Sequence, residues 1–238
     1  VVAGEPEEAV KTNVLGVMNT IRAAILAGVQ RVLVISTDKA VEPTTIYGLS
    51  KALAEGLALR ANTREVPRDA RAKERAPSGT RISCIRYGNV ISSRGAALHL
   101  FRQRVADGQP IPVTDMRCTR FWLTLGDAVT HVLVALDEMR GSEIFCPALP
   151  GGPVVDLAEA IGGHGYPTEV IGLRDGGEKL HEVLVAGHEA SRTTRTHDRF
   201  VIRPLVSSSR AEEALPPGFR YTIDTAPRLS VEQLRRMI

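Results

Sequence analysis

The spacing of apolar residues in the first half of the chain predicts alternating helices and strands. Over residues 7–27 apolar side chains recur at helical spacing, and Gly28 provides a stop signal. Residues 31–36 (RVLVIS) form a short β-branched run, typical of a parallel strand that is buried on both faces. A helix over 47–64 and a strand over 81–87 (RISCIRY) repeat this order. Helices and strands that alternate through short connections predict an α/β fold with a doubly wound parallel sheet.

The second half of the chain is patterned less regularly. Residues 64–79 are polar and show no apolar periodicity, which predicts a surface insertion. An amphipathic helix over 127–139 and a strand over 143–147 (EIFCP) continue the α/β pattern. The remainder contains scattered proline and glycine and is interpreted as a smaller second domain.

Composition and charge exclude several classes of protein. With 43% hydrophobic and 24% charged residues, the 238-residue chain can bury a full core. It has no run of about 18 apolar residues, and its N-terminus lacks the basic start of a signal peptide. We therefore expect a cytoplasmic protein without a membrane partner. The net charge of +3 comes from scattered basic residues, and only 4% of residues are aromatic, so no nucleic-acid partner is expected.

The cysteines and histidines do not indicate a metal site. Cys84, Cys118 and Cys146 are widely spaced and form no CxxC pair, so we interpret all three as packing residues. His181 has no second histidine four residues later and is interpreted as structural.

Candidate chemistry begins where the first predicted strand ends. Ligands of doubly wound sheets gather outside the carboxyl ends of the strands, which are followed here by loops at 37–40 and 88–95. Tyr47 and Lys51 are four residues apart and therefore share one face of a helix. A lysine ammonium beside a phenol lowers the pKa of the phenol, so that Tyr47 could take a proton from a substrate hydroxyl. A YxxxK pair alone is weak evidence.

The residues around this pair resemble a known family. A buried strand, Thr37 directly after it and YxxxK at the start of a helix resemble the short-chain dehydrogenase/reductases. Within them, STDKA followed by P-x-x-x-Y-G-x-x-K is similar to the UDP-N-acetylglucosamine 4,6-dehydratases of polysaccharide biosynthesis. The segments KTNVLG, RYGNV, SRG, TRFW and GEKLHE agree in order, so the resemblance covers most of residues 5–182.

The resemblance implies a role for each residue of the motif. Tyr47 would take the proton of the sugar C4 hydroxyl, Lys51 would support the phenolate and hold the cofactor ribose, and Thr37 would hydrogen-bond the C4 oxygen. Asp38 would be the acid for the C6 hydroxyl and Lys39 the base for C5, the Asp-Lys pattern of the C5-inverting enzymes. To act as a base near neutral pH, Lys39 needs a pKa lowered by burial or a neighbouring cation.

The resemblance also implies the ligands. The cofactor would be NADP, with NAD as the alternative, bound by Tyr47 and Lys51. The substrate would be a UDP-sugar, contacted by Lys39, Asn89, Arg120, Arg174 and, as a weaker candidate, Arg94, because arginines bind two diphosphate oxygens at once. No metal is expected. The chain is expected to form a homo-oligomer.

The resemblance assigns the chain to a partial Rossmann-like fold with a smaller C-terminal substrate-binding domain. The expected boundaries are 1–92 and 121–148 for the Rossmann-like part, and 93–120 and 149–238 for the substrate-binding domain. No GxGxxG turn precedes Tyr47, so the chain is expected to lack the family's N-terminal cofactor-binding segment.

Two alternatives to a dehydratase remain open. A UDP-sugar 4-epimerase or 5,6-dehydratase would share the Thr-Tyr-Lys triad. A truncated, non-catalytic UDP-sugar-binding or oligomerisation module would keep the substrate site without binding the cofactor.

Overall fold

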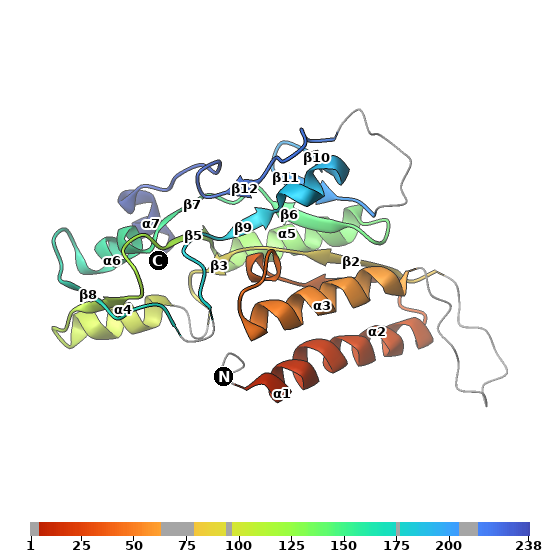
Figure 1. Cartoon of the computed structure of the whole chain (residues 1–238), viewed down its shortest axis with the longest axis horizontal. Helices are drawn as coiled ribbons and strands as arrows, with labels where there is room; N and C mark the ends of the chain where they lie inside the picture. The colour runs from red at the N-terminus through yellow and green to blue at the C-terminus, as the bar shows by residue number, and fades with distance from the viewer. Residues whose placement is uncertain (1–4, 63–78, 94–96, 175–176, 205–213) are drawn as a thin grey trace.

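The larger part of the molecule is built around a mixed five-stranded sheet (Figure 1). The structure is a computed structural model that describes residues 5–62, 79–93, 97–174, 177–204 and 214–238. The strand order is β1-β2-β6-β11-β10, and β1 (Arg31–Ile35), β2 (Arg81–Ile85) and β6 (Ile144–Pro147) are parallel. The predicted α/β fold with parallel strands is therefore confirmed.

Helices cover both faces of the parallel strands, as expected for a doubly wound sheet. Side chains alternate along a strand, so neighbouring positions of β2 enter different clusters. Ile82 and Cys84 pack with residues of α2 (Gly16–Leu26) and α3 (Ile46–Ala61). Ile85 instead packs with Ala135 of α5 (Leu125–Glu138). Figure 1 shows α2 and α3 side by side along the sheet.

The predicted N-terminal helix is continuous but not uniform. It consists of α1 (Pro6–Ala9), a π-helical stretch η2 (Val10–Leu15) and α2. Such wider turns accommodate an extra residue within a helix. The predicted strands 31–36, 81–87 and 143–147 correspond to β1, β2 and β6 within two residues at each end.

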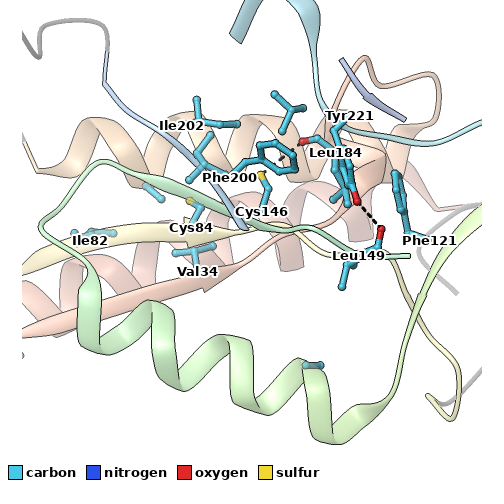
Figure 2. Packing of buried hydrophobic residues seen from close by; sticks show 14 of the residues in the cluster. Val34, Ile82, Cys84, Phe121, Cys146, Leu149, Leu184, Phe200, Ile202 and Tyr221 are labelled. Carbon is cyan, nitrogen blue, oxygen red and sulfur yellow. Dashed lines mark hydrogen bonds between the residues drawn. The ribbon is translucent and has the colours of Figure 1, made fainter. Parts of the chain in front are cut away.

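Two antiparallel strands extend the sheet beyond β6. β11 (Arg199–Ile202) pairs with β6, and β10 (Thr193–Arg195) pairs with β11. The sequence pattern assigned both segments to the second domain, whereas their hydrogen bonds continue the first sheet. In the shared core the rings of Phe200 and Tyr221 lie 4.6 Å apart, and the Tyr221 hydroxyl donates to the Leu149 carbonyl at 2.9 Å (Figure 2).

A second core lies at one end of the sheet. It is built by α4 (Ala97–Ala106), β4 (Ile111–Val113), β8 (Thr168–Val170), α6 (Val154–Gly162) and α7 (Val231–Met237). Phe101, Trp122, Leu157 and Leu234 are buried in it. Figure 1 shows α4, α6 and α7 gathered at this end.

A small three-stranded sheet joins the two cores. Its strands are β3 (Asn89–Val90), β5 (Thr119–Leu123) and β7 (Gly151–Pro153), with Asn89 paired to Trp122. Gly88 permits this junction, because a Cβ there would lie 2.5 Å from the Cβ of Phe121. The remaining strands, β9 (Val183–Val185) and β12 (Tyr221–Thr222), pair with each other, and the 3-10 helix η4 (Gly187–Arg192) follows β9.

The packing role predicted for the cysteines agrees with their surroundings. Cys84, Cys118 and Cys146 are buried free thiols, and burial raises the pKa values of Cys84 and Cys146. Among the residues that the structure describes, no cluster of histidine, cysteine and carboxylate side chains could hold a metal ion. Within the same residues, no helix has the length and apolar character needed to traverse a bilayer.

Candidate active site

A cavity of about 740 Å³ opens between the carboxyl ends of the strands and the second core. The cavity is lined by the loop after β1, the start of α3, strand β3, and residues Ile171, Arg174, Glu178, Lys179 and Glu182. Of the five predicted catalytic residues, Thr37, Lys39, Tyr47 and Lys51 line this cavity. The sequence motif is therefore assembled around one space.

Thr37 shapes the loop that carries the candidate residues. It caps the short 3-10 helix η3 (Asp38–Ala40), with its Oγ1 accepting from the backbone N–H of Lys39 at 3.3 Å. The same hydroxyl donates to Oδ1 of Asp38 at 2.9 Å. Thr37 is therefore held in one orientation at the cavity wall.

Lys39 is held as an ammonium ion by a polar cluster. Its Nζ lies 3.0 Å from Oδ1 of Asp38, 2.9 Å from Oδ1 of Asn89 and 3.9 Å from Oε1 of Glu182. Burial lowers the pKa of Lys39, but the two carboxylates outweigh this effect and the pKa is raised. The expected lowering of its pKa is therefore not found, because the carboxylates stabilise the charged form.

Tyr47 and Lys51 share one face of α3, as predicted, but they are not electrostatically coupled as expected. The Nζ of Lys51 donates to the carbonyl of Ile35 at 2.6 Å, and burial lowers the pKa of Lys51. Burial raises the pKa of the Tyr47 phenol, and the cation that opposes this effect is Lys39. The predicted lowering of the Tyr47 pKa by Lys51 is thus absent from this structure.

Asp38 occupies a different place from the other four residues. Its side chain is fully buried and does not line the cavity. Its Oδ1 accepts from Thr37 and Lys39, while Oδ2 has no hydrogen-bond partner within the described residues. Asp38 therefore supports the cavity wall, and one of its oxygens is free to carry a proton.

Gly48 allows α3 to approach the η3 loop. Thr45 caps the helix by accepting from the Gly48 N–H at 3.0 Å. A Cβ on Gly48 would overlap the carbonyl oxygen of Lys39 and lie 3.1 Å from the Cβ of Pro43. The glycine therefore fixes the distance between the Tyr47 helix and the Lys39 loop.

Replacement of Gly48 by alanine is expected to displace the Lys39 loop and reduce activity at least tenfold. The gain of about 1 kcal/mol in helix propensity would be lost to the backbone clash. Gly56→Ala is the matched control, because a Cβ there meets nothing within 4 Å and the variant should be more stable than the wild type. Thermal unfolding and turnover of both variants would test this; a Gly48→Ala variant as active and stable as Gly56→Ala would contradict it.

The predicted substrate-binding residues are only partly available to a ligand. Asn89 lines the cavity but accepts from Lys39. Arg120 lines it too, yet is buried and paired with Glu178 at 2.6 Å, and it also donates to two backbone carbonyls. Arg174 is exposed at the cavity wall. Arg94 lies outside the described residues.

The sequence interpretation missed three charged residues of the site. Glu178, Lys179 and Glu182 all line the cavity and belong to the segment GEKLHE, which was matched to the family without a role. Three buried polar atoms of the cavity wall have no hydrogen-bond partner within the described residues: Oγ of Ser36, Nε1 of Trp122 and Oε2 of Glu182. Oε2 of Glu182 has an ion pair with Lys179. None of these atoms could be identified from sequence spacing.

The described residues fit one end of a nicotinamide cofactor. Lys51 and Tyr47 lie at the carboxyl end of β1, and the unpartnered hydroxyl of Ser36 lies beside them at the cavity wall. Buried polar groups are normally hydrogen-bonded, so an orphan hydroxyl at this position is suited to a ligand. Within the described residues no glycine-rich turn follows a strand ahead of Tyr47, so the groups that would bind the cofactor diphosphate are not among them.

Comparisons with known proteins identify the family of the chain. The family model described as "Polysaccharide biosynthesis protein" matches residues 1–204. A UDP-N-acetylglucosamine 4,6-dehydratase (inverting) of Campylobacter jejuni is 34% identical over 96% of this chain and 69% of the relative. A UDP-glucose 4-epimerase of Rickettsia canadensis is 38% identical over 98% of this chain and 68% of the relative.

Solved structures show the same architecture. Pen from Bacillus thuringiensis superposes with a TM-score of 0.84 at 31% identity, covering 99% of this chain and 70% of that chain. DesIV of Streptomyces venezuelae, a dTDP-glucose 4,6-dehydratase with NAD and TYD bound, gives a TM-score of 0.61 at 20% identity over 74% of this chain and 58% of that chain. The second likeness supports the fold alone.

Proposed function

Because the chain belongs to the polysaccharide biosynthesis protein family of nucleotide-sugar-modifying enzymes, we propose that it is the catalytic and substrate-binding part of a UDP-N-acetylglucosamine 4,6-dehydratase, C5-inverting. The observation that supports this choice is the placement of Lys39 beside Tyr47 in one cavity. Elimination requires a second titratable group, for the C5 proton, in addition to the group that takes the proton of the C4 hydroxyl.

Elimination of water from a hexose needs oxidation at C4 first, because the C5 proton becomes acidic only beside a ketone. Tyr47 would take the proton of the C4 hydroxyl. The Thr37 hydroxyl, which donates to Asp38 in this structure, would turn to donate to the C4 oxygen instead. A bound NADP, or NAD, would supply the hydride acceptor for C4 and the hydride donor for C6. C5 would then take up a proton from water, while Lys39 releases the proton that it removed. Lys51 would hold the cofactor ribose.

Proton transfers at C5 and C6 would follow from the Asp-Lys pair. The resting Lys39 ammonium would first pass a proton to the Asp38 carboxylate that it contacts. The resulting amine would remove the C5 proton, and the electron pair of that bond would form the enolate. Oδ2 of Asp38 would protonate the departing C6 hydroxyl, so that water leaves. For this step Oδ2 has to turn into the cavity, which becomes feasible when a substrate hydroxyl replaces a partner of Asp38.

The UDP diphosphate would bind near Arg174 and Arg120. Arg174 is exposed at the cavity and can offer a bidentate guanidinium. Arg120 can do so only by exchanging Glu178 for a phosphate, because that carboxylate now holds it. Asn89 and Lys39 would lie beside the sugar, and Arg94 stays a weaker proposal from the family pattern.

The decisive test is the product. Incubation with UDP-N-acetylglucosamine and NADP is expected to yield a 4-keto-6-deoxy sugar nucleotide, identified by NMR. A C4 epimer as the sole product would favour the 4-epimerase, the activity named for the Rickettsia canadensis relative. Stabilisation by UDP but not by NADP, without any product, would favour the non-catalytic module.

An exposed apolar row supports the expectation of a homo-oligomer. Ile46, Leu49 and Leu53 of α3 lie on one helix face and are 38–55% exposed, with Leu15 and Met18 exposed on the neighbouring helix. Contiguous apolar surface of this kind commonly marks an interface.

Replacement of Leu49 and Leu53 by glutamate is expected to shift the protein to a lower molar mass in light scattering after size-exclusion chromatography. The charges would have to be buried in the interface, which is strongly unfavourable. Leu133→Glu is the control, because Leu133 is 61% exposed on α5, which packs elsewhere on the sheet. An unchanged mass for the double variant would exclude this row from the interface.

A further inference from the structure

Glu182 is a buried carboxylate shared by two lysines. It is 2% exposed, with Oε1 3.9 Å from Nζ of Lys39 and Oε2 2.7 Å from Nζ of Lys179. Lys179 is itself anchored, because its Nζ donates to the carbonyl of Val41 at 2.8 Å and lies 3.5 Å from that of Asp38. The Glu182 carboxylate is therefore closer to the Lys179 ammonium than to the Lys39 ammonium.

The charges around Lys39 come from four separate parts of the chain. Asp38 belongs to η3, Arg120 to β5, and Glu182 and Lys179 to the segment before β9, while the Tyr47 phenol faces Lys39 from α3. Glu178 holds Arg120. Lys39, Lys179 and Arg120 thus face three carboxylates, so removing one member changes the field at Lys39 directly.

We propose that Glu182 and Lys179 form a positioning pair that controls the protonation state of Lys39 through their shared carboxylate. This inference rests on the proposed function, in which Lys39 is the base for C5. When the Lys39 amine takes the C5 proton, the new ammonium faces Oε1 of Glu182, which stabilises it. Lys179 limits this stabilisation by holding the other oxygen, so that Lys39 can lose its proton again before the next turnover.

Competitive acetylation of the lysines with acetic anhydride as a function of pH tests this pair without cofactor or turnover. The Lys39 side chain is 31% exposed in the cavity, so the small reagent can reach it, and Lys11 is an exposed internal reference. Glu182→Gln is expected to lower the pKa of Lys39 by roughly one pH unit, because an opposite charge is lost. Lys179→Met is expected to raise the pKa, because a like charge is lost, whereas Lys179→Arg should leave it near the wild-type value.

The same titration of Lys39 also provides the control and the outcomes that would contradict the inference. Glu232→Gln removes an exposed carboxylate on α7 and should not change the titration of Lys39. Unchanged Lys39 titration in both Glu182→Gln and Lys179→Met would overturn the inference, whatever reaction the protein catalyses. A different result would refute the proposed function but support the positioning pair. In that case the two variants shift the pKa of Lys39 in opposite directions, and the wild type forms no dehydrated product.

The pH dependence of turnover is a second measurement, and it would not change if Glu182 had a purely structural role. In the active enzyme, the acidic limb of the pH–rate profile should move to lower pH in Glu182→Gln, because deprotonated Lys39 is then available earlier. Loss of activity by the same factor at every pH would assign Glu182 to structural support alone. Glu182→Asp, which keeps the charge, should return the limb toward its wild-type position.

Discussion

Replacement of Lys39 by alanine is expected to abolish formation of the 4-keto-6-deoxy product while oxidation at C4 continues. In the proposed reaction, oxidation depends on Tyr47, Thr37 and the cofactor, and it precedes removal of the C5 proton. General acid–base groups contribute roughly 10²–10⁴-fold to a rate, so product formation should fall by about that factor. Reduced nicotinamide, followed by its absorbance, should accumulate with the substrate in the variant.

The fold should survive the loss of Lys39. Glu182 keeps its ion pair with Lys179 at 2.7 Å, and Asp38 keeps the hydrogen bond from Thr37 at 2.9 Å. Lys11→Ala removes an exposed lysine from the N-terminal helix and is the matched control for the loss of one positive charge. Loss of oxidation and elimination together in Lys39→Ala would contradict the separate role of Lys39, since that residue would then be needed for the first step.

The elements of the parallel sheet could be predicted because their apolar patterns are local. RISCIRY is buried over most of its length, and burial of consecutive residues is visible in the sequence itself. RVLVIS was expected to be buried on both faces as well, but β1 is the edge strand of the described sheet and Ile35 is 38% exposed. β11 was not predictable in this way. Its residues Phe200 and Ile202 alternate with partly buried ones, and only the distant strand β6 gives this short segment a partner.

The sequence predicted four residues of the cavity wall, but not the electrostatics of the site. Thr37, Lys39, Tyr47 and Lys51 follow one strand end closely, so strand and helix geometry alone places them together. The pKa of Lys39 is raised first by the adjacent Asp38 and then by Glu182, and Glu182 belongs to a remote segment of the chain. The spacing of Tyr47 and Lys51 likewise placed both on one face but could not show that Ile35 accepts the lysine hydrogen bond.

Arg86 connects α3 to the rest of the protein through a buried ion-pair network. Its guanidinium makes two hydrogen bonds of 2.8 Å to Glu55 of α3 and further ones of 2.9 and 3.0 Å to Glu189 of η4. All three side chains are at most 5% exposed. Burial alone would raise the pKa of Glu189, but Arg86 outweighs this effect and holds the pKa below its ordinary value.

Replacement of Arg86 by methionine is expected to destabilise the protein by about 3–5 kcal/mol, since it leaves two carboxylates buried without their shared cation. For a chain of this size the unfolding midpoint should fall by roughly 10 °C. The triple variant Arg86→Met, Glu55→Gln, Glu189→Gln should recover most of the loss, because no buried charge remains. Arg117→Met, which removes an exposed ion pair with Asp115, should have little effect on the midpoint.

The pH dependence of stability gives an independent check on this network. In the wild type Glu189 has a lowered pKa, so it stabilises the fold above the ordinary carboxyl pKa, and this contribution is lost as the pH falls through the lowered value. In Arg86→Met the partner is gone and burial dominates, which reverses the direction of the Glu189 shift. The stability deficit of the variant should therefore shrink as the pH is lowered from neutral towards the ordinary carboxyl pKa, measured by denaturant unfolding at a series of pH values. A deficit that stays constant over this range would show that lost packing, rather than an unpaired buried charge, causes the destabilisation.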